Sequence, residues 1–187
     1  PANRFAVLGS LAAHEAIASL LWYLPDHHLA DPPLVGCADP TERRCELAAT
    51  VVPQRSTASY DVRVVLDDVL DADSFLEVRP RYAPNLVTGY GTLAGRAVGI
   101  VANQPQQRAG TLDIEASRKA ARFVDTCDVF NLPIITFVDT PGFEPGRDLE
   151  WRGMIRHGAE LVHAYCAATV PRICVWPRQA ACGAYTR

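Results

Sequence analysis

The chain has 187 residues, of which 49% are hydrophobic and 21% are charged, and its formal net charge is −3. This length suffices for one domain with a real core, while no apolar run approaches the ~20 residues that cross a bilayer and no secretory signal is visible. The acidic balance gives no reason to expect a nucleic-acid partner, because such partners normally bind a basic face.

The first third of the chain predicts a helix, a connector and a second helix. Residues 11–24 carry apolar residues at helical spacing, and Pro25 ends that helix. Residues 26–57 are rich in proline, aspartate and alanine, a composition typical of a connecting segment. Residues 60–70 then predict a short helix. We therefore expect the main body of the fold to begin near residue 58.

The middle of the chain predicts a buried sheet with a helix packed on it. Short strands are expected at residues 75–78 and 86–93. The run at 97–102 is almost wholly apolar, which is typical of a strand buried on both faces. A helix over 113–130 follows, and then a further buried strand at 134–138. This strand, strand, helix, strand order predicts a layered α/β fold.

The helix predicted at 113–130 has one apolar stripe. The stripe consists of Ala116, Ala120, Phe123, Val124, Cys127 and Phe130. Glu115 and Lys119 are spaced i,i+4 and are expected to pair on the opposite, solvated face. The neighbouring arginines share that charged stretch with acidic residues, which also indicates a solvated surface.

A loop rich in proline and glycine follows the strand at 134–138 and covers residues 139–146. Such a loop has a rigid, irregular backbone that can present N–H groups to a ligand. A single long helix is expected over 148–168, because its apolar residues keep a period of 3.6. Gly153 and Gly158 reduce helix propensity within it and suggest close approach of another backbone.

The end of the sequence predicts a third buried strand at 173–176, followed by a turn of small residues at 180–185. Small residues at a strand-to-helix turn allow successive backbone N–H groups to point at one oxygen atom. That arrangement is the geometry of an oxyanion hole.

The cysteines do not predict a disulfide framework or a zinc site, because none forms a CxxC pair. They are Cys37, Cys45, Cys127, Cys166, Cys174 and Cys182. Cys127, Cys166 and Cys174 are expected to be small core residues. We expect reduced thiols, a cytoplasmic protein and no metal.

Many short motifs occur in one consistent order along the chain. They include YDVR at 60–63, FLEV at 75–78, YAPN at 82–85, GRAVGIVANQP at 95–105, LDI at 112–114, KAARF at 119–123, CD at 127–128, PGF at 141–143, IRHGA at 155–159, AY at 164–165, ATVP at 168–171 and GAY at 183–185. Together they resemble the carboxyltransferase (β) subunit of biotin-dependent acyl-CoA carboxylases of the propionyl-CoA and acetyl-CoA carboxylase type. The resemblance covers about residues 11–187.

The resemblance implies a crotonase-like (ClpP/crotonase) α/β fold of repeated ββα units, incomplete at the C-terminus. It also implies that residues 1–57 are the end of a preceding domain plus the proline-rich connector, and that residues 58–187 are part of the biotin-side carboxyltransferase domain. Family active sites lie between domains of different subunits, so a homo- or hetero-oligomer is expected.

The implied chemistry is transfer of CO2 from carboxybiotin on a carrier protein to the α-carbon of an acyl-CoA. The partners would be biotin carboxylase and the biotin carboxyl carrier protein, in fatty acid or polyketide precursor metabolism. The implied catalytic residues are Gly183 and Ala184, whose backbone N–H groups donate to the biotin carbonyl oxygen. Biotin would also contact Pro141, Gly142 and Phe143.

The implied acyl-CoA contacts are Cys182, Thr186, Asn103 and Gln104. Cys182 stands where the family has a glycine, and Thr186 stands where the family usually has an aspartate that shapes acyl selectivity. Two alternatives stay open, the first motivated by these differences and the second by the chain stopping at Arg187 while the family continues. One is a biotin-independent acyl-thioester decarboxylase, or another crotonase-like enzyme, on the same scaffold. The other is a non-catalytic, truncated partner subunit that completes a larger assembly through the helix at 151–165.

Overall fold

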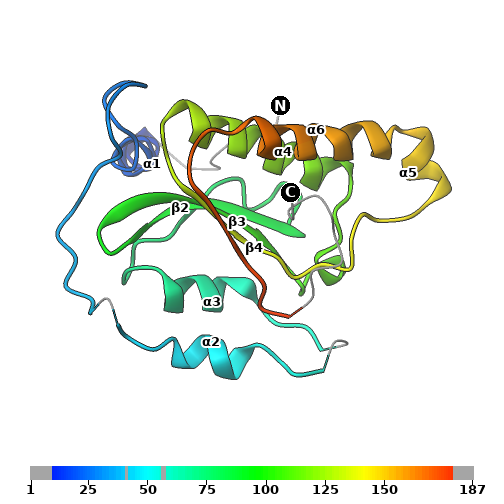
Figure 1. Ribbon diagram of the computed structural model, residues 1–187, viewed down its shortest axis with the longest axis horizontal. Coiled ribbons are helices and arrows are strands. Elements are labelled where there is room, and N and C mark those ends of the chain that lie inside the picture. The colour runs from blue at the N-terminus through cyan, green and yellow to red at the C-terminus, as the bar shows by residue number, and fades with distance from the viewer. Residues whose placement is uncertain (1–9, 41, 56–57, 179–187) are drawn as a thin grey trace.

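A computed structural model describes residues 10–40, 42–55 and 58–178, which form the fold drawn in Figure 1. The helices are α1 (Ser10–Leu21), α2 (Glu46–Val51), α3 (Val62–Val69), α4 (Ile114–Val129), α5 (Arg147–Trp151) and α6 (Met154–Ala167), with a 3-10 turn η1 at Arg108–Gly110. The strands are β1 (Leu76–Glu77), β2 (Leu86–Leu93), β3 (Arg96–Asn103), β4 (Ile134–Phe137) and β5 (Arg172–Val175).

The strands form one mixed five-stranded sheet in the order β1-β2-β3-β4-β5. β2 and β3 form an antiparallel hairpin in which Leu86 pairs with Asn103. β4 then runs parallel to β3, and β5 runs parallel to β4. The crossover from β3 to β4 passes through α4, as expected for parallel neighbours. The predicted α/β class and the strand, strand, helix order are confirmed.

Helices cover both faces of the sheet (Figure 1). α4 and α6 lie side by side on one face, while α3 lies on the other face with α2 outside it. Each face has its own apolar core, one centred on the inner side of α4 and one on α3. β3 is buried along nearly its whole length because both cores press on it. The prediction of a strand buried on both faces is therefore confirmed.

The helix predicted over 148–168 is wrong as a single element. The structure has α5 and α6 instead, separated at Gly153, whose φ is +87°. A left-handed residue cannot continue an α-helix, whereas glycine adopts that conformation without a steric penalty. The apolar period of the sequence continues across the break, which is why periodicity alone did not reveal it.

The prediction of a buried last strand is also wrong. β5 forms at Arg172–Val175, but every residue in it is exposed. It is one of the two edge strands of the sheet and pairs only with β4 among the described residues. Its apolar side chains are Ile173 and Val175, and Trp176 follows directly after it; they are 57%, 37% and 59% exposed.

Lys119 corrects a third expectation. Its side chain is only 2% exposed and lies within the fold, so it does not form the predicted surface pair with Glu115. The apolar stripe of α4 is confirmed, since Ala116, Ala120, Phe123, Val124 and Cys127 are buried and Phe130 packs against them. Cys166 and Cys174 are exposed, so only Cys127 of the three expected core cysteines is buried.

In the described residues of the connector predicted at 26–57, α2 is the one helix. Leu34 forms an isolated bridge with Arg96 at the start of β3. Residues 56 and 57 lie outside the described part, and the domain boundary placed there stays a prediction. In the described residues, none of the helices has the length and apolar character needed to cross a membrane.

Candidate functional site

Three loops leave the sheet at one edge. β3, β4 and β5 are parallel neighbours, and Ala102, Phe137 and Val175 are aligned across them near their carboxyl ends. The loops that follow these strands therefore begin close together, at the position where layered α/β proteins commonly bind ligands. We call this the carboxyl edge, comprising residues 103–112, 138–146 and 176–178.

The loop after β3 starts with two buried amide side chains. Asn103 is 1% exposed, and its Nδ2 donates to the carbonyl oxygen of Gly110 at 3.1 Å. Its Oδ1 atom is buried without a hydrogen-bond partner among the described residues. Asn103 therefore offers one unused acceptor at the carboxyl edge, which is the kind of group that a ligand donor can satisfy.

Gln104 is fully buried, and both ends of its amide are bonded within the protein. Oε1 accepts from the backbone N–H of Val62 at 3.2 Å, and Nε2 donates to Asp61 Oδ1 at 2.6 Å. Burial alone would raise the pKa of Asp61, but bonds from the Arg63 amide and from Gln104 lower it below its usual value. These bonds fix the loop to α3, while a substrate contact by Gln104 stays a prediction.

The loops after β3 and β4 touch each other at Gly110. A Cβ atom on Gly110 would lie 2.5 Å from the carbonyl oxygen of Asp139, and its φ is +71°. Leu112 and Phe143 form an isolated parallel bridge, in which the Leu112 N–H donates to the Gly142 carbonyl at 3.0 Å. The two loops therefore form one continuous wall that leaves no room for a side chain at residue 110.

The loop after β4 contains the predicted biotin contacts. The Gly142 N–H donates to Thr140 Oγ1 at 3.1 Å, so this donor is already used inside the loop. Pro141 is exposed, and the Phe143 side chain is 38% exposed. The Phe143 ring rests over Gly158 of α6, where a Cβ atom would lie 3.1 Å from it. The loop thus presents apolar surface rather than a free Gly142 amide.

A buried polar group sits at the end of β4. Asp139 is 2% exposed, and its Oδ2 accepts a hydrogen bond of 2.8 Å from the Tyr60 hydroxyl. Burial, together with the neighbouring Asp139 carboxylate, raises the pKa of Tyr60 above its usual value, so the hydroxyl remains a donor. Arg178 reaches the same carboxylate, with its Nε 3.3 Å from Oδ2.

Arg178 also ties down the segment before α3. Its Nη1 atom donates to the carbonyl oxygens of Arg55 and Ala58, and its guanidinium lies 5.6 Å from the centre of the Tyr60 ring. The residues that follow Arg178 are the ones in which the sequence predicts an oxyanion turn. Arg178, the last described residue, is therefore anchored at the carboxyl edge, and the turn itself stays a prediction.

The structure brings some of the predicted site residues together and leaves others untested. Asn103 and Gln104 begin the loop after β3, and Leu112 at the other end of that loop bridges to Phe143 in the loop with Pro141 and Gly142. Gly183, Ala184, Cys182 and Thr186 lie outside the described residues, so the predicted oxyanion turn stays a prediction. Sequence analysis missed Tyr60, Asp139 and Arg178 as a connected group, since residues 79 positions apart carry no common pattern.

The closest approach to a metal-ligand set in the described residues is Cys37, Asp39 and Asp71, whose ligand atoms lie within 4.8 Å of one another. It lies at the β2–β3 turn, at the opposite end of β3 from Asn103. Both carboxylates already cap backbone N–H groups: Asp71 accepts from Ala94 and Gly95, and Asp39 accepts from Ala72. We assign this cluster to turn structure.

Comparison with known proteins connects these features to a family. The carboxyl transferase domain matches residues 3–186. The carboxyltransferase subunit of propionyl-CoA carboxylase from Haloferax mediterranei is 51% identical over 173 residues, which are 92% of this chain and 34% of that protein. Methylmalonyl-CoA decarboxylase subunit alpha from Veillonella parvula is 46% identical, over 90% of this chain and 33% of that protein.

Transcarboxylase 12S, solved as a hexamer assembly with hydrolysed methylmalonyl-coenzyme A bound, gives a TM-score of 0.85 at 44% identity. That match covers 88% of this chain and 32% of the transcarboxylase chain. The likeness confirms the expected crotonase-like architecture. The chain spans about a third of the length of the curated relatives that it matches.

Proposed function

Since the chain belongs to the carboxyl transferase domain family, we propose that it forms the biotin-side part of a carboxyltransferase site in a biotin-dependent acyl-CoA carboxylase. The observation that carries this proposal is the carboxyl edge. There, β3 and β4 bring the loops with the motifs at 95–105 and 141–143 together, β5 ends beside them, and buried hydrogen bonds hold the described loops in place.

The described residues suit the apolar part of biotin. Pro141 and Phe143 present apolar surface at the carboxyl edge. When bound, biotin supplies the nitrogen atom that carries the carboxyl group. Backbone N–H groups of Gly183 and Ala184 would donate to its carbonyl oxygen, and these two residues are the catalytic residues that we propose.

The chain's own contribution is orientation more than proton transfer. The polar side chains at the ends of β3 and β4 are bonded to the protein, except at Asn103 Oδ1 among the described residues. Such a site lowers a barrier by holding dipoles in place before charge develops. We propose that Asn103 and Gln104, with Cys182 and Thr186, border the acyl-CoA.

We also propose the partners that this chemistry requires, namely a biotin carboxylase and a biotinyl carrier protein, with an acyl-CoA as carboxyl acceptor. Trp151 and Ile155 are 80% and 82% exposed at the junction of α5 and α6, and no described residue pairs with the outer edge of β5. Exposed apolar surface and unpaired strand edges favour association, so we expect an oligomer. The cytoplasmic location of the protein stays a prediction.

A second candidate is removal of a carboxyl group from a carboxyacyl-CoA, which the similarity to a methylmalonyl-CoA decarboxylase subunit favours. Turnover of malonyl-, methylmalonyl- and longer carboxyacyl-CoA thioesters, with and without free biotin, separates the candidates. Carboxylate loss only with biotin supports the carboxyltransferase. Loss without biotin favours the decarboxylase, and no loss under either condition favours the non-catalytic partner.

A further inference from the structure

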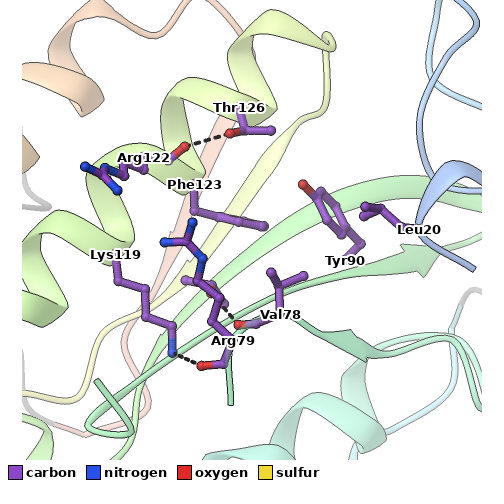
Figure 2. Close-up of a pocket in the computed structure, with 9 residues that line it drawn as sticks. Leu20, Val78, Arg79, Tyr90, Lys119, Arg122, Phe123 and Thr126 are labelled. Carbon is purple, nitrogen blue, oxygen red and sulfur yellow. Dashed lines mark hydrogen bonds between the residues drawn. The ribbon is translucent and has the colours of Figure 1, made fainter. Parts of the chain in front are cut away.

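Lys119 is a buried cation that the proposed chemistry does not use. It projects from α4 toward the segment that precedes β2, beside Arg79 and below Phe123 (Figure 2). The pocket that these side chains line has a volume of only about 30 Å³, which is enough for a water molecule and too small for an acyl-CoA or biotin. Lys119 therefore serves the protein rather than a substrate in this pocket.

The ammonium group of Lys119 binds the backbone of one short segment. Its Nζ atom reaches the carbonyl oxygens of Leu86 at 2.6 Å, Tyr82 at 2.7 Å, Arg79 at 3.1 Å and Ala83 at 3.3 Å. Arg79 and Ala83 have φ values of +58° and +46°, which L-residues seldom adopt. The segment 79–86 therefore needs hydrogen bonds from outside it to keep this backbone conformation.

That segment is joined directly to the carboxyl edge. The Asn85 side chain donates to the Thr111 carbonyl at 2.7 Å, and the Asn85 carbonyl accepts from the Gln104 N–H at 3.0 Å. Leu86 also faces Asn103 in the hairpin register. Both ends of the loop 104–112 are thus bonded to Asn85. Asn85 directly precedes Leu86, whose carbonyl oxygen lies nearest to the Lys119 Nζ atom.

We propose that Lys119 is a positioning residue: it fixes segment 79–86, and through Asn85 it holds the loop 104–112 in its place at the carboxyl edge. The path is short, because Asn85 lies between the Lys119 acceptors Ala83 and Leu86 and also contacts both ends of the loop. The relevance of this loop to catalysis rests on the proposed function, whereas the positioning itself does not.

The charges around Lys119 come from several elements. Glu77 of β1 favours its ammonium form, while Arg63 of α3 and Arg79 disfavour it. Arg122 and Tyr90 also line its pocket. Burial outweighs the favourable charge and lowers the pKa of Lys119 from 10.5 to about 8. Opening of the segment would restore the ordinary pKa, so the closed segment gains stability as the pH rises above about 8.

Hydrogen exchange by mass spectrometry on the full chain tests this positioning. Lys119→Met keeps most of the side-chain volume and removes every donor. We expect exchange to accelerate at least about tenfold in 79–86 and in 104–112. Arg122→Met is the matched control, because Arg122 lies on the same helix and lines the same pocket, and it should leave both segments unchanged. Acceleration confined to 79–86, or spread evenly over the chain, overturns the proposal.

A second variant and a pH series complete the test. Asn85→Ala should accelerate exchange in 104–112 while 79–86 stays protected. This variant also tests the proposal if Lys119→Met does not fold. Unchanged exchange in 104–112 contradicts the proposed link through Asn85. After correction for intrinsic rates, opening of 79–86 in the wild type should fall about tenfold between about pH 7 and about pH 9, because that opening exposes Lys119, and Lys119→Met should abolish the fall. A pH-independent wild type contradicts the proposal. Exchange is read without turnover, so failure of the proposed function would leave these results unaffected.

Discussion

The Tyr60 hydroxyl donates a hydrogen bond of 2.8 Å to Asp139 Oδ2, although the two residues are 79 positions apart. Tyr60 lies just before α3, and Asp139 lies two residues after β4. Tyr60 is 5% exposed and Asp139 is 2% exposed, so water does not replace this bond. The contact joins the connector side of the protein to the carboxyl edge.

Tyr60→Phe tests how much this hydrogen bond contributes to stability. Removal of the hydroxyl leaves a buried carboxylate with one donor fewer, so we expect the free energy of unfolding to fall by about 1.5–3 kcal/mol. Urea denaturation measures the change. Tyr82→Phe is the control, because it removes the same hydroxyl from a tyrosine that is half-buried and is not the donor to Asp139. Equal stability of Tyr60→Phe and the wild type would contradict the role of the bond.

Gly110→Ala tests the contact between the two loops of the carboxyl edge. The new methyl group would meet the Asp139 carbonyl oxygen at 2.5 Å, and residue 110 has a φ of +71°. We expect a loss of at least about 1 kcal/mol in the free energy of unfolding, since an L-residue is strained in this region. Gly36→Ala is a matched control with no atom within 4 Å of its added methyl group. A stability loss no greater than that of Gly36→Ala would contradict this close packing.

Lys119 predicts a distinct pH dependence of global stability. Burial lowers its pKa from 10.5 to about 8, so between these values the unfolded chain holds a proton that the folded chain has lost. Stability from this group therefore rises with pH in that window. From about pH 7 to about pH 9, the unfolding free energy of the wild type should rise by about 1.3 kcal/mol more than that of Lys119→Met. Parallel pH profiles for the two proteins would refute this.

Much of the sheet could be predicted because its strands are apolar runs bounded by turn residues. β3 and β4 are buried on both faces, and their sequences show it directly. The break at Gly153 was missed because apolar residues on either side continue the helical period. Lys119 was misplaced because a lysine spaced four residues from Glu115 has the pattern of a surface pair, and only the fold brings backbone carbonyl oxygens to its Nζ atom.

The candidate site, like the fold, could be predicted from the sequence only in part. Parallel strand ends made it predictable that Asn103 and the loop at 141–143 would lie together. The Tyr60, Asp139 and Arg178 group depends on the approach of the segment before α3 to the end of the sheet. No local period or motif spacing encodes that approach, so the sequence alone did not indicate it.

Ile155→Glu tests the expected association. Ile155 is 82% exposed and lies in the first turn of α6, where a negative charge suits the helix dipole. The variant should keep its unfolding free energy while sedimentation shifts toward smaller species, because a charge now lies on the apolar surface. Leu29→Glu is the control, since Leu29 is 79% exposed and lies outside α5 and α6. A wild-type chain that sediments as a monomer would contradict the oligomer.

The most direct measurement of the central claim follows the carboxyl group itself. Methylmalonyl-CoA labelled with ¹³C in its free carboxyl group is incubated with the chain and free biotin, and the products are resolved by mass spectrometry. The proposed carboxyltransferase predicts that the label leaves the thioester only when biotin is present and appears on biotin. Loss of the label as CO2 without biotin, or no loss at all, would contradict the claim.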